Sequence, residues 1–149
     1  MSGQTKTGVP LYLVTDSHVT LRMEESMTSL SFKEIRALDQ VTAPLCISFY
    51  LPSEPGPTHQ KANHIRLKNC IKALKKHIAS SNYSHNQKAD IIRRLERLRD
   101  SAVPMNGQSL SAFIGDKFTR IYSLNEPVET EMYVGTSFHT QPLRRILNR

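Results

Sequence analysis

The sequence lacks most of the features that would place it among secreted or membrane proteins. Its two cysteines, Cys46 and Cys70, are too few for the disulfide framework of a small secreted domain. We interpret both as reduced residues of the core. The chain does not open with a cationic segment followed by an apolar one, and no apolar run approaches the length of a membrane span. These absences predict a soluble, cytoplasmic protein without membrane contacts.

The sequence also lacks the common signatures of catalysis and metal binding. It contains no glycine-rich phosphate loop, no nucleophile elbow and no pair of carboxylates flanking an evident cleft. The six histidines are scattered, and with two distant cysteines they show no metal-ligand spacing. We therefore predict a domain that is not an enzyme, with no catalytic residue, no cofactor and no metal site.

What the sequence does contain is a local excess of positive charge. The chain of 149 residues has a net charge of +7, and its length fits a single domain. Residues 58–100 hold eleven Lys and Arg against three Asp and Glu, a net charge of +8, whereas the rest of the chain sums to −1. Such asymmetry favours a polyanionic partner. The alternative is a solvated pair of helices that only keeps the protein soluble.

The predicted fold is arranged around a strand at residues 45–51. Large apolar side chains alternate there with smaller or amphipathic ones, as in a β-strand. Ala43-Pro44 is expected to break the short helix that precedes this strand, and the prolines from Pro52 onward end the strand. A helix is then predicted from Thr58 or His59 to Ile78, with one buried stripe consisting of Leu67, Ile71, Leu74 and Ile78.

A second helix is predicted from Ser84 to about Ala102, because Ser84 and Gln87 have the spacing of a capping box. The two helices would form a long hairpin with a basic exterior. Shorter helices are predicted at 31–40 and 141–148, and strands at 109–114, 118–124 and 130–134. Residues 1–30 are expected to be an extension that is partly disordered or forms a short hairpin of residues 11–14 and 19–23. The prediction for residues 31–149 is an α+β domain with a mainly antiparallel sheet of about four strands between helices.

The basic exterior of this hairpin supplies the candidate RNA-binding residues. At about 100° per residue, five lysines gather away from the apolar stripe of the first helix, and three arginines of the second are expected to point outward. Ile65 falls among the lysines, either packed against the proline-rich loop or exposed on a binding face. Arg66 projects elsewhere, either to form a salt bridge with the sheet edge or to contact RNA. The full candidate set is Lys61, Arg66, Lys68, Lys72, Lys75, Lys76, Arg93, Arg94 and Arg97.

Two separated motifs carry a resemblance to a known family. The first is Cys46-x-Ser48-x-Tyr50-Leu51-Pro52, followed by Gly56-Pro57, Gln60 and Ile65-Arg66-Leu67-Lys68-Asn69, and the second is Gly135-x-x-Phe138-His139-x-x-Pro142-Leu143. In this order they resemble the N-terminal domain of the bacterial release-factor-like family. That family comprises bacterial relatives of the archaeo-eukaryotic peptide-chain release factors and of Pelota. The resemblance covers roughly residues 31–147.

The resemblance implies a sheet with helices against it, in a factor that acts on the ribosome in termination, rescue or dormancy. It also implies that the chain is a fragment, with further domains of the same protein after it. No Gly-Gly-Gln tripeptide is present, so peptide release would not belong to this chain. The codon-reading Asn-Ile-Lys-Ser motif is missing too, and we interpret Gly135-Thr136-Ser137 as a coincidental match to a release-factor tripeptide.

These observations predict a non-catalytic, ribosome-associated domain that contacts ribosomal RNA or tRNA through the basic hairpin. The alternative is a structural or protein-interaction domain without direct RNA contact. Tyr50 and Tyr133 would stack on bases only if they were exposed, and core or half-buried positions are the more common outcome for such aromatics.

Overall fold

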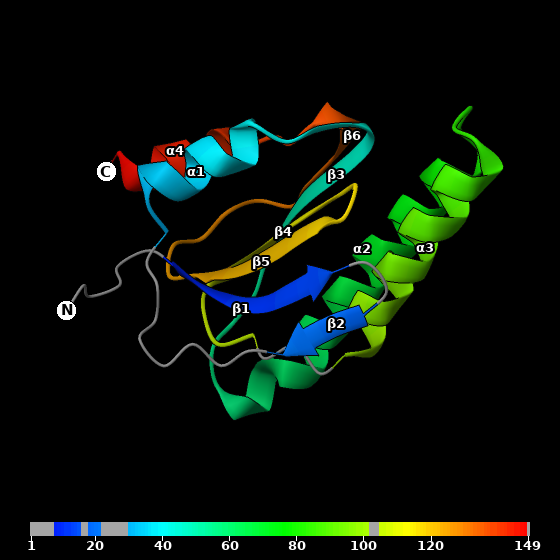
Figure 1. Cartoon of the computed structure of the whole chain (residues 1–149). Coiled ribbons are helices and arrows are strands. Elements are labelled where there is room, and N and C mark those ends of the chain that lie inside the picture. The colour runs from blue at the N-terminus through cyan, green and yellow to red at the C-terminus, as the bar shows by residue number, and fades with distance from the viewer. Residues whose placement is uncertain (1–7, 16–17, 22–29, 102–104, 149) are drawn as a thin grey trace.

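The computed structural model describes residues 8–15, 18–21, 30–101 and 105–148, and it shows one antiparallel sheet with helices on both faces (Figure 1). In chain order the strands are β1 (Gly8–Thr15), β2 (His18–Leu21), β3 (Thr42–Pro52), β4 (Ser109–Gly115), β5 (Phe118–Leu124) and β6 (Glu131–Ser137). The helices are α1 (Phe32–Asp39), α2 (Gln60–Ala79), α3 (His85–Asp100) and α4 (Gln141–Leu147), and a 3₁₀ turn at Pro57–His59 precedes α2.

The sheet has the strand order β2-β1-β5-β4-β3-β6, and every neighbouring pair is antiparallel. The predicted α+β class, with an antiparallel sheet between helices, is confirmed. The four strands predicted after residue 31 are β3 to β6. The β1–β2 hairpin, one of the two alternatives for the N-terminal extension, adds two more strands through the pairing of β1 with β5. Residues 1–7, 16–17 and 22–29 of the predicted extension lie outside the described residues, and so do the last two residues of the predicted strand at 19–23.

Two hydrophobic clusters fill the spaces between the sheet and its helices. One lies between the sheet and the α2–α3 pair and contains Ile47 and Phe49 of β3 together with the predicted stripe of α2. The other lies under α1 and α4 and contains Cys46 and Tyr50 of the same strand. Alternate side chains of β3 therefore enter opposite clusters, as its alternation predicts, and both of its faces are buried.

The central strand begins at Thr42 and not at Leu45 as expected, so Ala43 and Pro44 lie within β3 and not between α1 and the strand. The pairing of β3 with β6 is irregular between Thr42 and Cys46, and its pairing with β4 starts only at Ile47. Pro44 thus lies in a stretch where a regular ladder does not require its missing N–H group.

The predicted helix ends are close to those observed. Ser84 and Gln87 form the complete capping box at the start of α3. At α1, Oγ of Ser31 accepts a hydrogen bond from the Glu34 N–H. The Glu34 carboxylate accepts hydrogen bonds from Tyr122 and Arg120 of β5 and not from the Ser31 N–H, so α1 has no complete capping box. The predicted end of α3 at Ala102 falls outside the described residues, and the helix ends at Asp100.

Candidate nucleic-acid interface

Helix α2 presents the main candidate surface because its two sides differ in chemistry. Leu67, Ile71, Leu74 and Ile78 are buried against the sheet. On the side away from this stripe, Lys61, Lys68, Lys72 and Lys76 are all exposed, and we refer to these four residues as the α2 lysine row. They span sixteen residues of helix, so Lys61 and Lys76 are about 22 Å apart along the axis at the usual rise.

Few acidic side chains oppose this row. None of its four lysines lies within ion-pair distance of an Asp or Glu among the residues that the structure describes. Lys68, Lys72 and Lys76 follow one another at intervals of four residues, where like charges repel and cost a helix some stability. Ile65 lies within the row and is 50% exposed, so it does not pack under the proline-rich loop.

Lys75 connects α2 with α3 instead of extending the row. Its Nζ lies 2.6 Å from Oε2 of Glu96, and this hydrogen bond lowers the pKa of the Glu96 carboxyl. The pKa of Asp100 is also lowered, mainly by the hydrogen bond from the adjacent Arg99 and further by the charges of Lys75 and Lys68. One edge of the row is therefore bordered by acidic groups, whereas Lys72 and Lys76 stand apart from them.

The three candidate arginines of α3 differ in their environments. Arg93 is exposed and pairs with Asp90, one helical turn away. Arg97 is partly buried, and its Nη1 atom has no hydrogen-bond partner among the described residues. Arg94 was expected to point outward but is buried, with only 3% of its surface exposed. Its Nη1 atom lies 3.5 Å from Oδ2 of Asp90, one helical turn before it.

Arg94 is buried because it fastens α3 to the β4–β5 turn. Its guanidinium donates hydrogen bonds to the carbonyl oxygens of Gly115 and Phe118 and to Oγ1 of Thr119. Burial lowers its pKa, and the nearby charge of Asp90 opposes that shift. Arg94 consequently has a structural role and is unavailable to an RNA.

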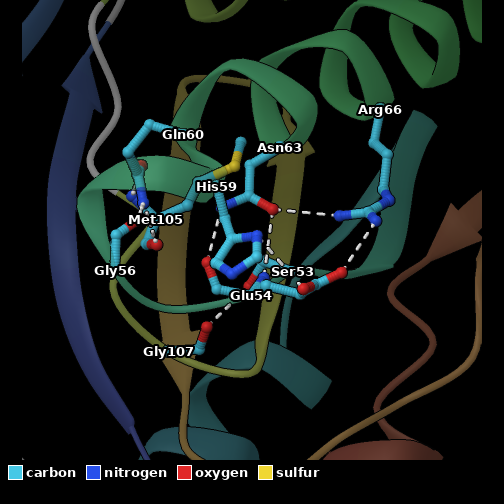
Figure 2. Close-up of polar contacts among 9 residues, drawn as sticks. All are labelled: Ser53, Glu54, Gly56, His59, Gln60, Asn63, Arg66, Met105 and Gly107. Atoms are coloured by element: carbon cyan, nitrogen blue, oxygen red, sulfur yellow. Dashed lines mark hydrogen bonds and ion pairs between the residues drawn. The ribbon is translucent and has the colours of Figure 1, made fainter.

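Arg66, the remaining candidate, belongs to a polar network in the loop between β3 and α2 (Figure 2). Its Nη2 atom lies 3.3 Å from Oε2 of Glu54, and its Nη1 donates to Oδ1 of Asn63. His59 approaches the other carboxylate oxygen of Glu54 at 3.2 Å. The salt bridge predicted as one alternative for Arg66 is thus present, although its partner lies in the loop and not on a strand.

Two amide side chains hold this loop in place, as Figure 2 shows. The buried Asn63 accepts a hydrogen bond from the Glu54 N–H and donates one to the Glu54 carbonyl. Gln60 donates to the carbonyls of Gly56 and Met105 and accepts from the Met105 N–H. Neither role follows from the sequence pattern, in which Gln60 is only one position of a motif and Asn63 belongs to no motif.

The two resemblance motifs meet in space on the other face of the sheet. The Tyr50 hydroxyl donates a hydrogen bond to the His139 carbonyl, and the His139 N–H donates to Oγ of Ser48. Cys46 is the strand partner of Gly135, and Phe138 is buried in the same cluster. These contacts give the motif residues a role in packing, so the motifs alone do not mark a binding surface.

Tyr50 is fully buried, which removes it from any stacking surface, whereas Tyr133 is partly exposed on β6. The Tyr133 ring stacks on His139 with centroids 3.7 Å apart, and its hydroxyl donates to Glu131. Burial lowers the pKa of His139, although the Glu131 carboxylate acts in the opposite direction. An open cavity of about 500 Å³ adjoins this group, with Glu131 and Arg145 in its lining.

The structure thus groups only part of the candidate set. Four of the nine candidates form the α2 lysine row. Three more form ion pairs, namely Arg66, Lys75 and Arg93, and the last two are fully or partly buried, namely Arg94 and Arg97. Within the described residues, no group of three or more His, Cys, Asp or Glu side chains could hold a metal ion. No helix in the same part of the chain is long and apolar enough to cross a membrane.

Comparison with known proteins adds no identification. No protein-family model matches the sequence, and no curated protein matches it either. The function must therefore be argued from the residues and their geometry.

Proposed function

We propose that this chain is an RNA-binding domain of a ribosome-associated translation factor that contacts ribosomal RNA or tRNA through the α2 lysine row. The observation that carries the proposal is the row itself, with four exposed lysines that form no ion pair with an acidic side chain of the described residues. Lysine is a flexible point charge, which suits contacts with phosphate and carries little base specificity. We place no catalysis in the domain, and the two resemblance motifs support the choice of a translation partner.

The spacing of the row fits an extended polyanion. Over about 22 Å an A-form or single-stranded backbone presents several phosphates, and each one neutralised releases condensed counterions. A solubilising surface needs no such alignment, because scattered charges of either sign serve that purpose. The exposed Ile65 within the row adds an apolar contact between the lysines.

Replacement of Lys68, Lys72 and Lys76 by Ala tests the proposal. We expect weaker binding to tRNA and to ribosomes, with the slope of log K against log salt reduced by about two to three, because three phosphate contacts are lost. Fluorescence anisotropy with labelled tRNA and ribosome co-sedimentation at graded salt measure the two effects.

A matched control removes three exposed charges elsewhere, through Lys33→Ala, Arg36→Ala and Lys117→Asn. Asn is chosen at position 117 because Lys117 has a φ of 55°. The control has the same net charge as the test variant, so a general charge effect would weaken both equally. Equal binding by the two variants, or failure of the parent chain to sediment with ribosomes even at low salt, would favour the alternative of a structural or protein-interaction domain.

A further inference from the structure

Strand β6 forms one end of the sheet and lacks the Lys and Pro residues that commonly protect an edge strand; the irregularity in its pairing with β3 places the extra residues in β3, opposite the C-terminal end of β6. It pairs with β3 on one side, and no other strand of the described residues pairs with it on the other. Natural edge strands are commonly protected by Lys, Pro or a bulge that prevents pairing with another chain. Residues 131–137 contain neither Lys nor Pro, and the only charged residue is Glu131 at the first position.

The exposed apolar side chains of the molecule are concentrated on this strand. Two of the four large hydrophobic residues exposed in the described part of the chain, Met132 and Tyr133, belong to β6. None of its seven residues is buried, whereas all seven residues of β4 are. An exposed edge with apolar side chains and a free row of backbone N–H and C=O groups is a template for strand addition.

We propose that β6 is a self-association surface, through which two copies of this chain pair their β6 strands antiparallel about a two-fold axis. About a two-fold axis perpendicular to the sheet, two facing residues must point to the same side of the sheet. Because side chains alternate along a strand, the numbers of the two facing residues are then both even or both odd. The register that pairs all seven residues is centred on Val134, which then faces its own copy. This proposal does not depend on the proposed RNA binding.

The sequence of β6 is complementary to itself in this register. Tyr133 faces Gly135 of the other copy, where nothing lies within 4 Å of the position that a Cβ would occupy, so the aromatic ring has room beside the strand. Met132 faces Thr136, and Glu131 faces Ser137, which keeps the two carboxylates at opposite ends of the seam. Aromatic and β-branched cross-strand pairs stabilise sheets, while like charges directly opposite destabilise them.

A single seam of seven residues is smaller than a standard protein interface, so the expected dimer is a weak one that depends on concentration. Sedimentation equilibrium from low to high micromolar concentration should show the average mass rising from that of one chain towards that of two. In Val134→Lys two ammonium groups face each other on the axis, and we expect this variant to remain a monomer over the same range. Asn69→Lys adds the same charge on the exposed surface of α2 and should dimerise as the parent does.

Because Val134 also packs against the core, cysteine cross-linking provides a second test that needs no disruptive charge. Under mild oxidation Val134→Cys should form a covalent dimer of identical chains. Met132→Cys and Thr136→Cys should each cross-link poorly alone but form a mixed dimer when combined, and Asn69→Cys gives the background from random collisions. A parent chain that stays monomeric at every concentration, a dimer that survives Val134→Lys, or cross-linking of Val134→Cys no better than the background would overturn the proposal.

Discussion

Phe49 tests the predicted packing of the central strand at the scale of one residue. It is fully buried and lies in the same cluster as Leu67 and Ile71 of α2. We expect Phe49→Ala to lower the free energy of unfolding by about 3–5 kcal/mol, through lost transfer energy and the cavity left behind. The midpoint of urea denaturation should fall accordingly.

The matching control for Phe49 is Lys72→Ala, on the same helix as the packed stripe. Lys72 is exposed and lies in the α2 lysine row, so its removal should change the free energy of unfolding by less than about 0.5 kcal/mol. A tolerated Phe49→Ala together with a destabilising Lys72→Ala would contradict the packing described for β3 and α2.

Arg94 lies on the inner side of α3, and we expect it to contribute to stability and not to RNA binding. Arg94→Met removes the donor to two carbonyl oxygens and one hydroxyl at the β4–β5 turn, and buried acceptors left without a partner cost about 1–3 kcal/mol. We expect a loss of that size in the free energy of unfolding, with tRNA affinity unchanged, when both are measured on the same preparation.

Arg93→Met is the neighbouring comparison for Arg94→Met, because Arg93 is exposed and pairs only with Asp90 in the same helix. Surface pairs of this kind contribute little to stability. If Arg93→Met were the more destabilising of the two, the assignment of Arg94 as the residue that fastens the turn would be wrong.

At the scale of elements, strong periodicity made the helices and the central strand predictable. The apolar stripe of α2, the capping box of α3 and the alternation around Phe49 each depend on neighbouring residues, and each agrees with the structure. Arg94 could not be placed in this way. A helical projection separates apolar from charged residues, but it does not show that the β4–β5 turn passes over α3 with carbonyl groups that require donors.

The same limit applies to the loop between β3 and α2. Its prolines and glycine predict correctly that β3 ends at Pro52, yet the loop is held by two amide side chains of α2, one of which, Gln60, also bonds to the backbone of Met105, 45 residues further along the chain. Such long-range hydrogen bonds leave no periodic pattern in the sequence. The salt bridge of Arg66 was foreseen only as one of two alternatives for the same reason.

Asn63 provides the test for this loop as a structural element. Asn63→Ala removes the hydrogen bonds to both backbone groups of Glu54 and the acceptor for Arg66, and we expect a loss of about 1–3 kcal/mol in the free energy of unfolding. Faster trypsin cleavage after Lys61 in the otherwise folded protein should accompany it. His64→Ala, at the adjacent and partly exposed position, should change neither quantity, and equal effects of the two variants would remove the special role of Asn63.

At the scale of the whole molecule, the two proposals concern different surfaces of one sheet. The α2 lysine row lies on the α2–α3 face, and β6 lies at the end of the strand order. A two-fold axis perpendicular to the sheet keeps the α2–α3 pairs of both copies on the same face, so the proposed dimer would present two lysine rows to one partner. Two rows on one RNA would raise the apparent affinity through effective concentration.

The sheet also joins the two hydrophobic clusters into one cooperative structure, because β3 supplies Phe49 to one cluster and Tyr50 to the other. A large-to-small change in the α1–α4 cluster should therefore destabilise the opposite face as well. Leu143→Ala in α4 removes a fully buried side chain, and we expect it to cost about 2–5 kcal/mol. The chain has no tryptophan, so fluorescence at 305 nm (about the tyrosine maximum) comes from its five tyrosines, of which Tyr50 and Tyr122 are buried in the α1–α4 cluster, while far-ultraviolet circular dichroism reports mainly on α2 and α3. Both signals should shift to lower urea together in Leu143→Ala, whereas a fluorescence transition that moves alone would show that the two faces of the sheet unfold independently.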